Sequence, residues 1–186
     1  MAVWGETPQV TGSSDLFAIP YEEQLHPIFH DFKDDILIVS KGEKSVSSTA
    51  GHGLMEGNIF AENRYAQART RFADLQIALQ KGDLEAFGLI TENEALTLHA
   101  LMMTSEPSYI LMRPNTLAQI KLLRDVRKDT GHPVYFSLDA GPNLHLLYPS
   151  SIVDPVREFI QSELLPLCEE NKMIADQTGK GPKAIV

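Results

Sequence analysis

The chain has 186 residues, of which 43% are hydrophobic and 22% are charged, and these values are typical of one globular domain with a sizeable core. The formal net charge of −9 argues against nucleic acid as a partner, although a local site for a small anion stays compatible with it. The single cysteine, Cys168, excludes an intramolecular disulfide and favours the cytoplasm, and no apolar run approaches the roughly 20 residues of a membrane span.

The N-terminal half begins without a strong pattern. Residues 1–15 are rich in Gly, Thr, Ser and Pro and predict an irregular lead-in. The apolar run Asp35–Val39 predicts a strand, and Ser45–Ser48 is predicted to pair back with it. A helix is expected over Ile59–Gln80. Its inward face is predicted from apolar residues that recur at spacings of three and four, namely Ala61, Tyr65, Ala68, Phe72, Leu75 and Leu79.

Two more helices are predicted in the middle of the chain. Asp83 can cap a helix that runs to about Met103, because its short side chain can accept a hydrogen bond from the first turn. Asn115 can cap a third helix, which Gly131 closes. The residues expected to face inward on this third helix are Leu117, Ile120, Leu123 and Val126.

The C-terminal part is predicted to hold a hairpin. Val134–Leu138 and Leu144–Tyr148 are expected to be strands, joined by the turn Asp139–Asn143. Asp154-Pro155 is predicted to start a last helix that reaches about Leu165, and Met173–Ala175 is predicted to be a short strand. Strands joined by tight turns, with helices grouped between them, predict an α+β fold in two layers, an antiparallel sheet covered by helices.

The most informative segment for chemistry is Ser137-Leu-Asp-Ala-Gly-Pro-Asn143. An aspartate at a strand end, followed by a stiff turn, presents a carboxylate on a rigid element, as proton abstraction or cation stabilisation requires. The same residues also suit a purely structural turn. His99 on the second predicted helix is expected to be a core-edge histidine with one satisfied hydrogen bond rather than a base or a metal ligand.

A second candidate is Ser47-Ser48-Thr49, which lies just before Gly51 and Gly53. Its hydroxyls can bind a phosphate or a substrate hydroxyl, or they can simply cap the next helix.

Taken together, these segments resemble diphosphomevalonate decarboxylases, within the superfamily that includes galactokinase, homoserine kinase and mevalonate kinase. The resemblance rests on Asp139-Ala-Gly-Pro-Asn143 and on four further segments in the family's order. These are Ser13-Ser-Asp-Leu-Phe-Ala18, Val46-Ser-Ser-Thr-Ala-Gly51, Glu94-Ala-Leu-Thr-Leu-His-Ala100 and Thr178-Gly-Lys-Gly-Pro182. It implies the ferredoxin-like C-terminal domain of that superfamily over residues 16–186, with residues 1–15 a lead-in or a remnant of a missing N-terminal ATP-binding domain.

The resemblance also implies a reaction. ATP, with Mg²⁺, phosphorylates the tertiary hydroxyl of mevalonate 5-diphosphate, and loss of that phosphate and of CO₂ gives isopentenyl diphosphate. Asp139 matches the family's catalytic aspartate, and Ser48 matches its substrate-binding serine, with Ser47 and Thr49 as neighbours. The family is commonly a homodimer.

Two features depart from the family's pattern. Gly51-His52 stands where the family has Gly-Met, and the family's Gly- and Ser-rich ATP loop is absent. We therefore expect the chain alone to be inactive, to bind no cofactor tightly, and to need the missing N-terminal domain as a partner. Two alternatives stay open from sequence: a mevalonate kinase of the same superfamily that acts on the 3-hydroxyl, and a non-catalytic α+β interaction module.

Overall fold

A computed structural model describes residues 1–21, 25–42, 53, 55 and 57–179. In these ranges a four-stranded sheet has the order β4-β5-β3-β6, and every neighbouring pair is antiparallel. Its strands are β3 (Phe32–Leu37), β4 (Tyr135–Leu138), β5 (Leu144–Pro149) and β6 (Met173–Ile174). The predicted hairpin and C-terminal strand are therefore confirmed, and so is the α+β class.

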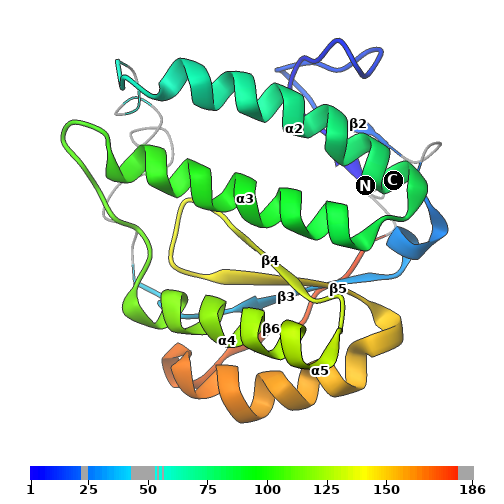
Figure 1. Ribbon diagram of the computed structural model, residues 1–186, viewed down its shortest axis with the longest axis vertical. Helices are drawn as coiled ribbons and strands as arrows, with labels where there is room; N and C mark the ends of the chain where they lie inside the picture. The colour runs from blue at the N-terminus through cyan, green and yellow to red at the C-terminus, as the bar shows by residue number, and fades with distance from the viewer. Residues whose placement is uncertain (22–24, 43–52, 54, 56, 180–186) are drawn as a thin grey trace, which may run out of the picture.

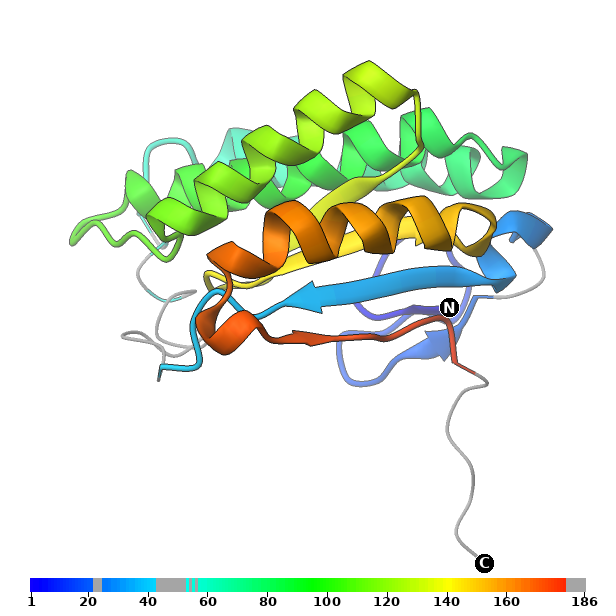
Figure 2. The same cartoon turned by 90° about the horizontal axis from the view of Figure 1, so that it is seen from below.

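In the part of the chain that the structure describes, three long helices and one short helix pack around this sheet. They are α2 (Ala61–Lys81), α3 (Leu84–Met103), α4 (Pro114–Thr130) and α5 (Val153–Phe159), which continues through a π turn and a 3₁₀ turn to Leu167. Figures 1 and 2 show α4 and α5 beside the sheet, α3 along strand β4, and α2 outside α3.

The main core lies between the sheet and the helices α3, α4 and α5. Its residues come from alternate positions of the strands, because successive side chains of a strand point to opposite faces. They include Phe136, Leu144, Leu146 and Ile160, all fully buried. A second core joins α2, the start of α3 and the N-terminal segment to the other face of the sheet through Phe32 and Leu147.

Local sequence explains most of the helix boundaries. The Asp83 carboxylate accepts a hydrogen bond from the backbone N–H of Ala86 at 2.9 Å, as its capping role predicts. Gly82 and Gly131 end α2 and α4 with φ of +71°, a conformation that favours glycine. Among the described residues, no helix is both long and apolar enough to cross a membrane.

Several predicted details were wrong. Arg113 is the N-cap of α4 and Pro114 is its first residue, so Asn115 lies inside the helix, because proline fits the first helical position. Leu117 is 54% exposed, whereas Ile120 and Leu123 face the core as predicted. The buried face of the first turns runs instead through Thr116 and Gln119.

Three further boundaries differ from the prediction. Tyr65 on α2 is 45% exposed, whereas Ala61, Ala78 and Leu79 of the predicted helix are buried. Strand β3 begins at Phe32, three residues before the predicted Asp35, because the backbone of Phe32, Lys33 and Asp34 pairs with β5. Helix α5 begins at Val153, so Asp154 lies in the first turn instead of capping it.

The predicted lead-in is more ordered than expected. Strand β1 (Ala2–Val3) pairs antiparallel with β2 (Ile19–Pro20), and the Trp4 indole N–H donates to the Asp15 carbonyl at 3.0 Å. Residues between these strands form turns. The expected strand Ser45–Ser48 lies outside the described residues.

Candidate functional site

The candidate site is the turn between β4 and β5, which carries Asp139. The Asp139 side chain is 82% exposed, although the strands on both sides of it are buried. Gly141 donates its backbone N–H to the Asp139 carbonyl at 2.7 Å, which closes the turn. The structure thus presents the carboxylate to solvent at the end of a buried hairpin, as the sequence predicts.

Three elements hold this turn through hydrogen bonds. From α3, the His99 Nε2 atom lies 3.0 Å from the Asp139 carbonyl oxygen. From α4, the Thr116 hydroxyl donates to the Pro142 carbonyl at 2.6 Å. From the segment after β3, the Ser40 N–H donates to the Asn143 side chain at 3.0 Å. The turn is therefore fixed on a rigid frame, and its exposed carboxylate is accessible to a ligand.

His99 has a supporting position here. Its side chain is 1% exposed, and burial lowers the pKa of its imidazole, while the hydrogen bond to the Asp139 backbone opposes that effect. A carbonyl oxygen only accepts, so Nε2 carries the proton in the neutral ring. The predicted core-edge histidine with one satisfied hydrogen bond is thus confirmed.

On the face of the sheet opposite α4 and α5, His145 approaches Asp139 and is bound in turn by Asp34. His145 on β5 places its Nε2 atom 4.0 Å from Asp139 Oδ2, and its Nδ1 atom lies 2.9 Å from Asp34 Oδ1 on β3. The hydrogen bond to Asp34 is the main cause of a raised pKa for His145. Sequence reasoning missed this pair, because its members are 111 residues apart; only the alternation of strand β5 hinted that His145 shares a face.

The predicted substrate-binding residues Ser47, Ser48 and Thr49 lie outside the described residues, so their placement relative to Asp139 stays a prediction. Within the described ranges, no group of three or more His, Cys, Asp or Glu side chains is arranged to hold a metal ion. We assign no step to Mg²⁺ in this part of the chain.

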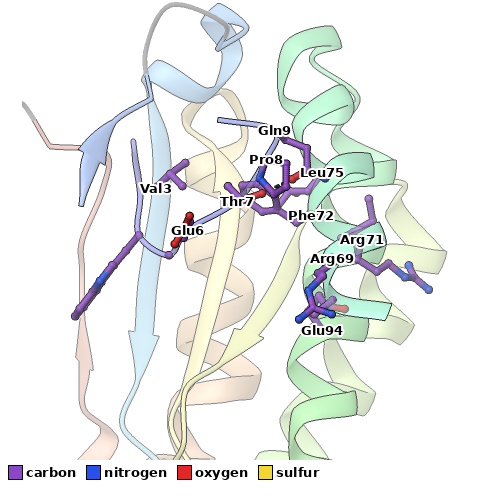
Figure 3. A pocket seen from close by; sticks show the side chains of 14 residues that line it. Val3, Glu6, Thr7, Pro8, Gln9, Arg69, Arg71, Phe72, Leu75 and Glu94 are labelled. Atoms are coloured by element: carbon purple, nitrogen blue, oxygen red, sulfur yellow. Dashed lines mark hydrogen bonds between the residues drawn. The ribbon is translucent and has the colours of Figure 1, made fainter. Parts of the chain in front are cut away.

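Two cavities border the N-terminal segment. One of about 660 Å³ opens beside the Asp34 end of the pair and is also lined by Phe32, Leu147 and Asp176. The other, of about 470 Å³, lies between the N-terminal segment and α2, where Phe72 and Leu75 give it an apolar wall (Figure 3). No described residue of the Asp139 turn lines this second cavity, so it lies apart from the candidate site.

Comparison with known proteins agrees with this fold. The chain is 28% identical over 131 residues to the phosphomevalonate decarboxylase of Haloferax volcanii, and this alignment covers 70% of this chain and 40% of the relative. It is 28% identical over 152 residues to the diphosphomevalonate decarboxylase of Aspergillus fumigatus, and this alignment covers 79% of this chain and 38% of the relative. The chain thus spans about two fifths of the length of these curated relatives.

A solved structure shows the same fold. The structure of MDDEF in complex with MVAPP, AMPPCP and magnesium superposes with a TM-score of 0.75 at 21% identity, over 88% of this chain and 49% of that one. A family model, described as mevalonate 5-diphosphate decarboxylase C-terminal domain, matches residues 35–184, a range that contains Asp139 and all of β4, β5 and β6. The chain therefore belongs to the mevalonate 5-diphosphate decarboxylase C-terminal domain family.

Proposed function

We propose that this protein is the C-terminal part of an ATP-dependent decarboxylase that converts mevalonate 5-diphosphate to isopentenyl diphosphate, with Asp139 as its catalytic carboxylate. The observation that carries the proposal is the Asp139 turn, whose main chain is held by α3 and α4 while its carboxylate is exposed. Membership of the family and the name of the Aspergillus relative support the reaction class and the substrate.

Asp139 would act on the tertiary hydroxyl of the substrate. A carboxylate beside that hydroxyl accepts its proton as ATP phosphorylates the oxygen. Once ionised again, the carboxylate offsets the positive charge that develops at the carbon bearing this oxygen as the phosphate leaves, and the electron pair released with CO₂ then forms the double bond. ATP is a second substrate that supplies a phosphoryl group to this oxygen. Ser48, with Ser47 and Thr49, is proposed to hold the substrate, on the strength of the sequence resemblance alone.

The charges around Asp139 support a second domain. Asp34, Asp139 and Asp176 all act on His145, so the described side of this site is acidic. Acidic side chains repel phosphate groups, and the cations that bind a diphosphate therefore have to come from elsewhere. We infer that an N-terminal domain, of which residues 1–15 are a remnant or lead-in, supplies these cations and binds ATP and Mg²⁺. The chain alone is then inactive. We further propose, from the family resemblance, that the full protein is cytoplasmic and forms a homodimer.

A specific observation favours a second substrate. The Haloferax relative is named a phosphomevalonate decarboxylase, so the monophosphate is the alternative to the diphosphate. Both substrates carry the same tertiary hydroxyl and carboxylate, and the Asp139 geometry suits either. The two differ only in the length of the phosphate chain, which would be read by the proposed N-terminal domain.

The test is CO₂ release by the full-length protein with ATP and either substrate. Asp139→Asn keeps the size of the side chain but removes the base, and we expect turnover to fall on the order of 10³-fold. Asp129→Asn, on the exposed surface of α4, is the matched control and should leave turnover unchanged.

Circular dichroism should show both variants folded. Turnover retained by folded Asp139→Asn would refute the catalytic assignment, and phosphorylation without CO₂ release would identify a kinase instead.

A further inference from the structure

Two consecutive aspartates on β3 point to opposite faces of the sheet. Asp35 is fully buried beneath α5, where it accepts a hydrogen bond from the Tyr148 hydroxyl and lies 3.7 Å from Arg157. Asp34, the residue before it, must therefore face the other side, because side chains alternate along a strand. Asp34 is thus free of the buried cluster and available to the Asp139 side of the sheet.

The register of β3 and β5 places His145 between the two carboxylates. Asp34 is paired with Leu147 and Ile36 with His145, so Asp34 lies on the diagonal from the imidazole. The Nδ1–H of His145 donates to Asp34 Oδ1 at 2.9 Å, and this bond aims Nε2 at Asp139 Oδ2, 4.0 Å away. Such a carboxylate-bound imidazole has a fixed tautomer and orientation.

We propose that His145, oriented by Asp34, is a positioning residue that acts through Asp139. His145 receives the proton that Asp139 takes from the substrate hydroxyl, so this proposal rests on the proposed function. The O–H bond of the substrate breaks as an Oδ–H bond forms on Asp139. That Oδ–H bond then breaks as an Nε2–H bond forms on His145, which becomes an imidazolium beside Asp34. Asp139 is restored as a carboxylate.

The exposed Asp139 side chain makes this transfer geometrically accessible. A rotation of its carboxylate about the side-chain bonds closes the 4.0 Å gap, and nothing buried has to move, because the side chain is 82% exposed. Hydrogen bonds between catalytic groups often tighten only in the substrate complex. His99, the other imidazole near the turn, cannot take this role, since its Nε2–H is engaged by the Asp139 main chain in a buried site.

The surrounding charges favour the imidazolium. The hydrogen bond to Asp34 is the largest cause of the raised pKa of His145, and burial opposes it. The negative charges of Asp34 on β3, Asp139 on the turn and Asp176 after β6 raise the pKa further. The ring accepts a proton only when neutral, so turnover should fall as the pH drops through the pKa of His145, which lies above the ordinary 6.5.

The first experiment is the pH profile of kcat for CO₂ release by the full-length protein. His145→Gln should lower kcat on the order of 100-fold and remove the acid limb that His145 causes. Asp34→Asn should move that limb to lower pH, because the amide keeps the hydrogen bond but loses the charge. His30→Gln and Asp129→Asn, both at exposed positions, are the matched controls and should reproduce the wild-type profile. A His145→Gln profile identical to the wild type would overturn the proposal.

A second measurement separates this proposal from the proposed function. Histidine ring signals in ¹H–¹⁵N NMR spectra of the full-length protein give the pKa of His145, assigned by its loss in His145→Gln. Asp34→Asn and Asp139→Asn should each lower that pKa, whereas Asp129→Asn should not. If the wild type releases no CO₂ from either substrate, the proposed function fails, and the titration still decides the network. An unchanged pKa in Asp139→Asn would overturn the coupling even in an active decarboxylase.

Discussion

Gly88→Ala is the substitution that tests most directly how α3 is seated against the sheet. Alanine in the interior of a helix normally stabilises a protein by about 1 kcal/mol over glycine. In this chain, however, a β-carbon at position 88 would lie 2.0 Å from Tyr135 Cδ1 and 2.1 Å from its Cγ. We therefore expect the usual sign of this substitution to be reversed.

The size of the effect follows from how little the ring can move. Tyr135 is 4% exposed, and the Arg127 guanidinium stacks on the ring at 4.7 Å from its centroid. Overpacking of this kind costs about 1–3 kcal/mol, and a clash of over 1 Å against a confined ring belongs at the upper end. Subtracting the gain in helix propensity leaves a loss of about 2 kcal/mol.

Thermal unfolding followed by circular dichroism measures this loss. For a protein of this length, about 2 kcal/mol corresponds to a fall in Tm of roughly 4–8 °C. The internal control is the Tyr135→Ala background, in which the clash is absent and Gly88→Ala should raise stability by about 1 kcal/mol. If Gly88→Ala raises the Tm of the otherwise unaltered protein, then Gly88 of α3 does not pack closely against Tyr135 of β4, and the reasoning is refuted.

Two further predictions concern the supports of the Asp139 turn. Burial lowers the pKa of His99, so below pH 6.5 the unfolded chain binds more protons than the folded one, and the free energy of unfolding should fall as the pH drops. His99→Gln should flatten this dependence in urea titrations between about pH 7 and pH 5, and parallel curves for the two proteins would contradict the assignment. The Thr116 hydroxyl donates to the Pro142 carbonyl at 2.6 Å and accepts from the Arg113 N–H at 3.2 Å. Because Thr116→Val removes both hydrogen bonds, it should lower the free energy of unfolding by about 2–4 kcal/mol. Thr70→Val, at an exposed site on α2, is its control and should change stability by less than about 0.5 kcal/mol, so an equal loss in both variants would argue against a special role for Thr116.

The helices and the hairpin were readable from local patterns. Apolar spacing, Asp83 as a cap and Gly131 as a terminator each act within one or two turns of helix, so sequence alone places these elements closely. The errors arose where neighbouring residues offered competing starts. Arg113 and Pro114 begin α4 ahead of Asn115. Leu117 faces solvent because the buried face of the first turns runs through the polar residues Thr116 and Gln119, which an apolar pattern does not mark.

In the candidate site too, one part could be predicted from the sequence and another part could not. Asp139 stands in a short, distinctive turn, and the resemblance of that turn to a known family is readable from consecutive residues. The groups around it are not, because His99, Thr116 and Asp34 are distant from it in sequence and no local pattern marks them as its neighbours.

By itself, the sequence determined the α+β class, the order of the main elements and the aspartate on which the chemistry is proposed to depend. These follow from short-range propensities and from one continuous motif. Only the tertiary structure decided that α3 and α4 brace the Asp139 turn and that His145 lies between Asp34 and Asp139. Those relations depend on strand register and helix packing, which bring together side chains as far as 111 residues apart.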